Sequence, residues 1–188
     1  ISDFQIEGMS IGDSLLDYMT EVEILEEVEF NKMDYYYLNE PNKYAEVYLW
    51  KEDFPTYDDM AFIIKNNLKN QFVTNKNDEK EKYTILSIRG IIQYEEDFDG
   101  CEVKKDEVVR ELTKIFPNVL KNEWTKVHPI DPSGNSIVVG VEFGFESGDA
   151  VDIKCIDFEE NFRIKNNYGE GLTVSIRYKE VSSWLDDY

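Results

Sequence analysis

The chain has 188 residues, 40 of them acidic and 20 basic, and its formal net charge at pH 7 is −20. Such a charge repels nucleic-acid phosphates and anionic lipid headgroups, and no stretch approaches the roughly 20 consecutive apolar residues of a membrane-spanning helix, so neither nucleic-acid binding nor membrane insertion is expected. Hydrophobic residues make up 41% of the chain, which is enough for a folded core and too much for intrinsic disorder.

Residues 8–29 are predicted to form two short helices. Ser10 and Asp13 resemble a capping box with Asp in place of Glu, and Thr20 and Glu23 have its usual form. Apolar residues recur at helical spacing after each of these pairs. The pattern therefore predicts a helix on either side of Thr20.

After these helices the period of the apolar residues changes to two, which predicts strands. In the strand predicted over 44–52, Tyr48 and Trp50 share one face. Together with the tyrosines at 35–37, this face predicts either a recognition surface or a part of the core that a helix covers.

The polar segment 66–82 predicts a loop, and residues 83–94 predict the longest strand. The clearest helix spans 104–116 and ends before Pro117. A further helical turn is predicted over 119–126. Alternating strands are predicted over 137–146, 151–155 and 172–178, and a last helical turn over 181–188.

Short turns join most of the predicted strands. The sheet is therefore expected to be largely antiparallel, with helices packed on one face, and the fold class is α+β. We predict a single domain over 1–188. Because helices followed by strands occur twice, two similar halves over 8–94 and 103–178 remain an alternative.

An acidic segment after the longest strand imitates a calcium loop. Oxygen ligands at positions 1, 3, 5 and 12, with Gly at position 6, are typical of such loops. Glu at position 1 and a short Asp at position 12 depart from the pattern, so the alternative is an acidic turn before a helix N-terminus, where carboxylates are favourable. The predicted ligands are Glu95, Asp97, Asp99 and Asp106.

His128 is the only histidine in the chain. A hydrolytic site would need it beside a nucleophile and an orienting acid, and Asp131 and Ser133 follow within the same loop. Three residues so close in one Pro-rich loop do not easily line up in those roles. The alternative is a structural histidine that forms hydrogen bonds within the turn.

Cys101 and Cys155 are the two cysteines of the chain. Cys155 lies on the inward face of its predicted strand, and Cys101 lies near the start of the main helix, where the helix dipole would lower the pKa of a free thiol. A disulfide, a reactive Cys101 and two inert thiols all stay open at this point.

Three segments together resemble a known family: residues 6–18 (Ile-Glu-Gly-Met-Ser-Ile-Gly-Asp-Ser-Leu-Leu-Asp-Tyr), 128–134 and 147–157. They are similar to an uncharacterised family of small acidic exported proteins from marine bacteria. The resemblance implies export, to the periplasm, where Cys101 and Cys155 would form a disulfide. It implies no catalytic or binding residue. The start of the chain at Ile1 is expected to reflect signal cleavage or truncation.

The sequence favours a non-enzymatic, exported binding or protein-interaction protein, because no nucleophile–base pair and no metal set is recognisable. The alternatives are a small hydrolytic enzyme that uses carboxylates or the His128 loop, and a calcium-stabilised envelope protein. A weaker architectural likeness to small envelope lipoproteins and β-lactamase-inhibitor-like domains also implies protein–protein contact. The expected partner is another envelope protein or a small cationic ligand, and no cofactor other than calcium is expected. The acidity could instead serve solubility alone.

Overall fold

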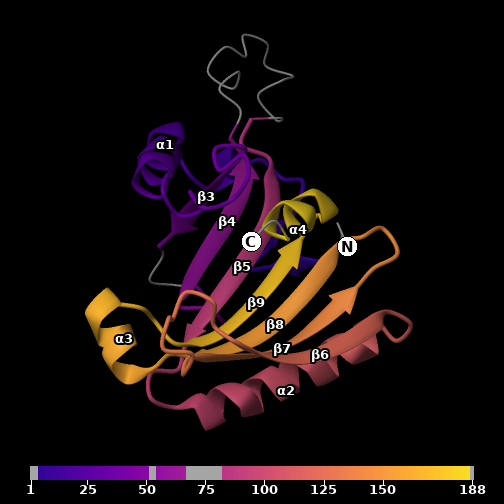
Figure 1. The fold of residues 1–188 in the computed structure, drawn as a ribbon. Coiled ribbons are helices and arrows are strands. Elements are labelled where there is room, and N and C mark those ends of the chain that lie inside the picture. Colours follow the sequence, from indigo (N-terminus) through magenta and orange to yellow (C-terminus); the bar gives the residue numbers. More distant parts are fainter. Residues whose placement is uncertain (1–3, 51–53, 67–81, 187–188) are drawn as a thin grey trace. The chain divides into compact units, whose positions relative to one another are not determined.

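The computed structural model describes residues 4–50, 54–66 and 82–186, and its helices and strands are drawn in Figure 1. The first half contains β1 (Gln5–Ile6), β2 (Met9–Ser10), the 3-10 turn η1 (Leu15–Asp17), α1 (Glu21–Phe30), β3 (Tyr44–Leu49), β4 (Asp59–Lys65) and β5 (Ile85–Gln93). The second half contains α2 (Phe98–Ile115), β6 (Leu120–Val127), β7 (Ile137–Gly144), β8 (Ala150–Asp157), α3 (Glu160–Asn166), β9 (Gly171–Arg177) and α4 (Lys179–Leu185).

Among the described residues, seven strands form an antiparallel sheet in the order β3-β4-β5-β9-β8-β7-β6, and β1 and β2 form a small separate ladder. α2 packs against β8 of the large sheet. The predicted α+β class with a largely antiparallel sheet is therefore confirmed. Residues 67–81 of the predicted polar loop, and 51 and 52 of the first predicted strand, lie outside the described residues.

The chain divides into two compact units: Ile1–Gly90 with Ile176–Tyr188, and Ile91–Ser175. The second unit is thus an insertion in the first, because the chain returns to the first unit after Ser175. The sequence-based prediction was one domain over 1–188, with two consecutive halves as the alternative.

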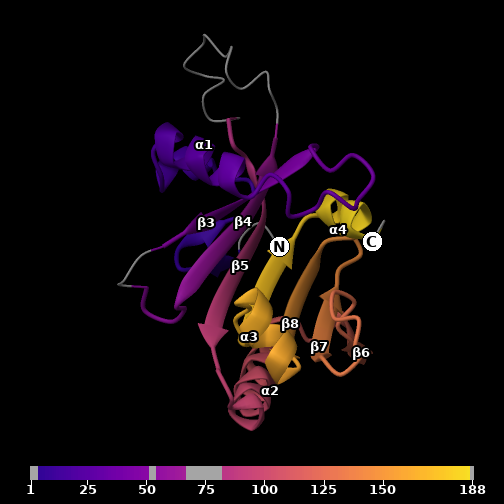
Figure 2. The ribbon, with the colours of Figure 1, turned by 60° about the vertical axis from the view of Figure 1, so that its left-hand side comes forward.

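The first unit is built on the β3–β4 hairpin, which pairs Tyr44 with Lys65 at one end and Leu49 with Met60 at the other. Phe62 in β4 is fully buried, and burial of a side chain of this kind stabilises a fold by about 1.5–3 kcal/mol. α1 packs against β3 (Figure 2).

An aromatic cluster in the first unit involves α4. Trp184 is 4% exposed, and its ring centroid lies 4.8 Å from that of Tyr35 and 4.9 Å from that of Tyr44. The cluster also buries Val181. The predicted C-terminal helical turn is confirmed, and Trp184 is the residue that anchors it.

Of the two helices predicted over 8–29, the second is confirmed and the first is wrong. α1 begins after Thr20, which forms the predicted capping box with Glu23. Upstream, the backbone pairs with the start of β5 instead: the Gly12 N–H donates to the Ile85 carbonyl (2.8 Å), and the Ile85 N–H donates to the Asp13 carbonyl (2.9 Å). The positive φ of Gly12, 93°, also lies outside helical geometry.

The second unit contains the β7–β8 hairpin, paired from Ile137 with Asp157 to Gly144 with Ala150. The inward residues that alternation predicts in β8, Val151, Ile153 and Cys155, are all fully buried. They lie under α2, which Cys155 joins through a disulfide to Cys101; the two Cα atoms are 6.0 Å apart.

The helical turn predicted over 119–126 is wrong, because these residues form β6. The strand pairs with β7 along its whole length, from Leu120 with Gly144 to Val127 with Ile137. Apart from Trp124, every residue of β6 is exposed. The Trp124 ring covers Gly140, its partner in β7, where any Cβ would collide with the indole.

Two further boundaries differ from the prediction. α2 begins at Phe98 rather than at 104, because the Asp97 side chain caps it by accepting the Gly100 N–H (3.0 Å). α3 was not predicted; Glu159 caps it, and its seven residues bury no side chain fully.

The disulfide gives a test of the second unit. Unreduced protein refolded under oxidising conditions should show no free thiol when denatured, and two after reduction. The bond spans 54 positions of sequence, so a double Cys101→Ala, Cys155→Ala variant should lose about 4 kcal/mol of unfolding free energy. Denaturant unfolding measures this loss, with reduced wild type as the control. Two free thiols in a monomeric oxidised sample would contradict the pairing.

Candidate functional site

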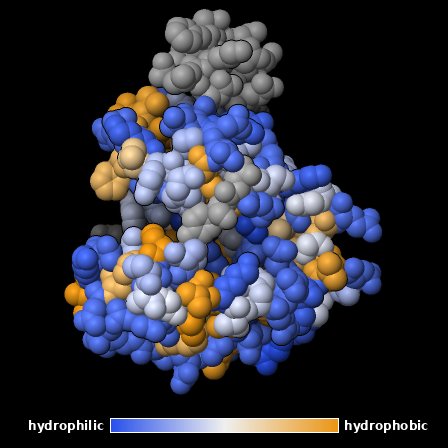
Figure 3. All heavy atoms as spheres, viewed as in Figure 1, coloured by the Kyte–Doolittle hydropathy of each residue, from blue (hydrophilic) through white to orange (hydrophobic). Residues whose placement is uncertain are grey.

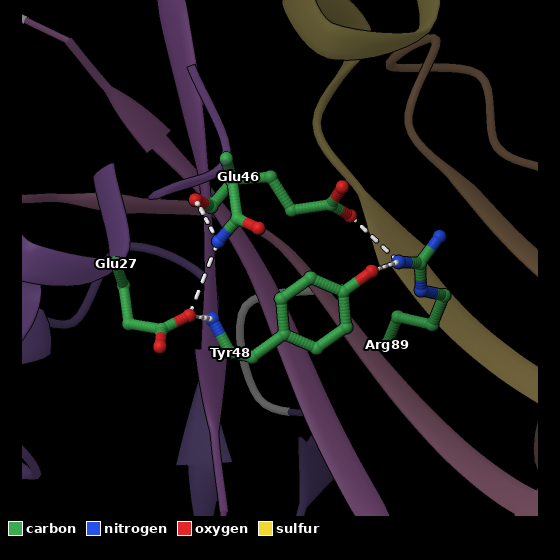
Figure 4. A network of polar contacts seen from close by, with 5 residues as sticks. Glu27, Glu46, Tyr48 and Arg89 are labelled. Carbon is green, nitrogen blue, oxygen red and sulfur yellow. Dashed lines mark hydrogen bonds and ion pairs between the residues drawn. The ribbon is translucent and has the colours of Figure 1, made fainter. Parts of the chain in front are cut away.

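A network of polar contacts in the first unit surrounds Tyr48 (Figure 4). The Arg89 guanidinium donates to the Glu46 carboxylate (2.6 Å) and to the Tyr48 hydroxyl (3.1 Å). Burial alone would lower the pKa of Arg89, but Glu46 and Tyr48 outweigh it and raise that pKa. Arg89 is therefore a fixed positive charge, and its hydrogen bond to Glu46 is charge-assisted.

The same network ties α1 to β3. The Glu27 carboxylate of α1 accepts the Tyr48 backbone N–H (3.1 Å) and the Asn31 side-chain amide (3.1 Å), and that amide also donates to the Glu46 carbonyl (3.3 Å). Figure 4 shows Glu27 and Tyr48 joined in this way. These hydrogen bonds join the helix to the strand, so the network positions α1 beside β3.

Asp34 forms a carboxyl pair with Glu46. Burial raises the pKa of Asp34 to about 6, and the charge of Glu46 and a hydrogen bond to its side chain add to this effect, while Arg89 opposes it. Asp34 therefore takes up a proton at a higher pH than an ordinary aspartate does. A cavity beside this cluster, lined by Asn31, Tyr35 and Glu46, has a volume of about 20 Å³, which is the size of one water molecule.

The Asp34 pair predicts a pH dependence. The pKa of Asp34 in the folded state, about 6, exceeds its ordinary value of 3.8, so its contribution to stability is complete below pH 3.8 and is lost as the pH rises through 6. Asp34→Asn should remove this loss, and Glu46→Gln should lower the pKa of Asp34 in an NMR titration. Denaturant unfolding of wild type and Asp34→Asn between pH 4 and 8 gives the comparison. Parallel curves would show that folding does not raise the pKa of Asp34.

Tyr48 and Trp50, the predicted binding residues, lie together on one face. Their rings are stacked, with centroids 5.4 Å apart and planes 10° apart, and Trp50 is 63% exposed. Other exposed aromatic side chains in this unit are Phe30, Tyr36 and Tyr37. In the view of Figure 3, hydrophobic residues form small separate patches on a largely hydrophilic surface. Recognition by Tyr48 and Trp50 stays a prediction.

The acidic segment of the second unit differs in shape from a calcium loop. α2 begins at position 4 of the predicted loop, so Asp99 and Asp106 are helical residues, and Asp97 caps the helix. Asp106 lies 3.6 Å from the Lys105 ammonium. Among the described residues, no group of three or more His, Cys, Asp or Glu side chains is placed to hold a metal ion.

The calcium prediction can be tested by thermal unfolding. We expect millimolar calcium not to raise the Tm, because Asp97 already caps α2 and the ligands at positions 5 and 12 lie on that helix. Magnesium is the control ion. A rise in Tm under calcium that a chelator reverses, and that magnesium does not reproduce, would restore the site at Glu95, Asp97, Asp99 and Asp106.

The His128 loop is held together by Asp131, which is buried. Burial raises the pKa of Asp131, but hydrogen bonds from the side chains and backbone N–H groups of Ser136 and Ser133 outweigh it and hold that pKa well below its usual value. His128 accepts the Ile130 N–H at Nδ1 (3.4 Å) and packs against Phe158. Asp131 therefore orients the serines, and these contacts form no serine–histidine–acid relay.

A groove of about 710 Å³ lies in the second unit between α2 and the strands β6 and β7. Three of its helix residues, Val103, Asp106 and Arg110, are spaced to form one face of α2. The remaining lining residues are Lys105, Val109, Lys121, Glu123, Trp124, Thr125, Val139, Gly140 and Val141. Apolar and charged side chains thus share one elongated site.

The groove differs in charge from the chain as a whole. Its lining contains three cations and two carboxylates, whereas the chain has twice as many acids as bases. Lys105 is paired with Glu102 and Asp106, and Lys121 with Glu123, which lowers the pKa of Glu123. Arg110 makes no ion pair with any residue that the structure describes. The groove therefore offers one guanidinium for an anionic group of a ligand.

Sequence analysis missed the groove because it missed β6. Both faces of that strand are solvated, so it has no alternation of apolar and polar residues. The available signals were Pro117 and Asn118 as a turn before it, and Trp124, Thr125 and Val127 as residues that favour strands.

No family model, curated protein or solved structure matches the chain. In the part of the chain that the structure describes, none of the helices has the length and apolar character needed to cross a membrane.

Proposed function

We propose that the protein is a non-enzymatic, exported binding protein of the cell envelope that holds a partner in the groove between α2 and β6. The groove is the observation that carries this proposal. Its volume of about 710 Å³ falls within the range of roughly 300–1,000 Å³ that is usual for ligand sites.

The composition of the groove also supports binding. Val103, Val109 and Val141 supply apolar surface, and Arg110 supplies a charge that can orient a ligand. Val103 is 62% exposed although it is apolar, so contact with a partner would remove it from water.

The disulfide supports export. Disulfides persist in oxidising compartments and are rare in the cytosol. Cys101 and Cys155 are both buried and joined, which suits a permanent structural bond of a periplasmic protein. The marine-bacterial family that the sequence resembles is consistent with the same location.

The hydrolytic alternative would use the carboxyl pair of Asp34 and Glu46, because the raised pKa of Asp34 suits a general acid. The cavity beside this pair holds about one water molecule, so a substrate would need the surface next to Tyr48 and Trp50. The groove of the second unit has more room for a ligand, and we therefore favour binding.

A tryptophan placed in the groove tests the proposal. Peptides enriched from a random library displayed on phage, with oxidised wild type as bait, should bind Val103→Trp at least about tenfold more weakly, because the indole occupies the groove. The matched control is Val22→Trp, since Val22 is 65% exposed on α1 of the first unit. Fluorescence polarisation measures the Kd values. Enriched peptides that bind Val103→Trp as well as wild type, or no enrichment at all, would contradict the groove as the binding site.

A further inference from the structure

β6 is an edge strand next to the groove. In the sheet order it is the last strand, and no strand in the described part of the chain pairs with its outer edge. Among the described residues, the backbone groups on that edge are therefore available to pair with another strand, which is the usual basis of peptide capture by sheet edges.

The register shows which residues of β6 present these groups. The His128 N–H donates to the Ser136 carbonyl (2.8 Å), and the pairing of β6 with β7 continues from this point in unbroken antiparallel register. Because backbone direction alternates along a strand, the even-numbered residues of β6 face β7. Lys121, Glu123, Thr125 and Val127 therefore direct their N–H and C=O groups outward.

Three of these four residues border the groove. The side chains of Lys121, Glu123 and Thr125 line it together with Arg110 of α2. In an antiparallel pair, residues opposite each other place their side chains on the same face. A strand added to β6 would thus direct every second side chain to the mouth of the groove.

We propose that the partner binds as an extended peptide segment that adds a strand to the outer edge of β6, with apolar side chains at alternate positions and a carboxylate that pairs with Arg110. The mode of binding rests on the proposed function, in which the groove is the binding site. The carboxylate follows from charge complementarity, because Lys105 and Lys121 already have acidic partners and Arg110 has none among the described residues.

The side chains of β6 disfavour a second copy of this chain, compared with a peptide, as the strand that pairs with its outer edge. Lys121, Glu123 and Lys126 put three charges on the strand, and charged edges are a common protection against self-pairing. Two copies would also bring together net charges of −20 each.

Thr125→Pro tests the strand addition. Proline removes the outward N–H of Thr125 and leaves the hydrogen bonds to β7 in place, so the variant should fold with the Tm of wild type. Peptides enriched on wild type should bind it at least about tenfold more weakly. The matched control, Thr125→Val, keeps the N–H and should bind as wild type does. If Thr125→Pro does not fold, peptides methylated at alternate backbone nitrogens provide the same test on wild type.

Arg110→Glu tests the carboxylate. Enriched peptides should contain an acidic residue, and their affinity should fall about threefold to tenfold for Arg110→Glu but not for Lys114→Glu, a control on the same helix outside the groove lining. Peptides without an acidic residue, or equal affinity for both variants, would overturn the pairing with Arg110.

The outcomes separate the two proposals. Binding that is lost in Val103→Trp and kept in Thr125→Pro would overturn strand addition and leave the groove as the site. Binding that is kept in both would overturn the groove itself. Self-association in sedimentation that Thr125→Pro abolishes would overturn the peptide as occupant in favour of a second copy.

Discussion

The position of α2 over β8 is the constraint on which the groove of the second unit depends. Cys101 in the first turn of the helix is bonded to Cys155 on the inward face of β8. Further along α2, the side chains of Val109 and Leu112 are also buried. The helix therefore stays above β8 and does not move over β6 and β7. Val139 and Val141 of β7 are left to form the floor of the groove. A helix centred one or two strands further along the sheet would fill this space with its own side chains.

In the first unit the corresponding constraint is polar. Arg89 of β5 and Glu46 of β3 form an ion pair across the intervening strand β4, and Glu27 extends the network to α1 through the backbone of Tyr48. Removal of either charge of a buried pair leaves the other without compensation, so the network acts as one unit. The exposed ring of Trp50 stacks on the ring of Tyr48. Because Arg89 and Glu27 hold Tyr48 in place, they also fix the surface on which Trp50 packs.

The parts of the fold that could be predicted from sequence are those with one buried face. In β8 the fully buried residues alternate, because one side of the strand meets the core; they are Val151, Ile153 and Cys155. The start of α1 is predictable because Thr20 and Glu23 form its capping box through local hydrogen bonds. β6 has no buried face, so its residues contain no period to detect. The segment around Gly12 has helical spacing, but its conformation is decided by pairing with Ile85, more than 70 positions away. The groove combines residues of α2, β6 and β7, and local patterns do not predict such distant combinations.

The contact of Trp124 with Gly140 has a consequence for the edge strand that it belongs to. Only glycine leaves room for the indole at this point of β7, and the neighbours on the same face, Val138 and Glu142, carry side chains where the ring would have to lie. A slip of β6 by two residues in either direction is therefore blocked by volume. β6 is therefore held in a single register. Its outward N–H and C=O groups keep fixed positions along α2, so an incoming chain always meets the same arrangement of hydrogen-bond donors and acceptors.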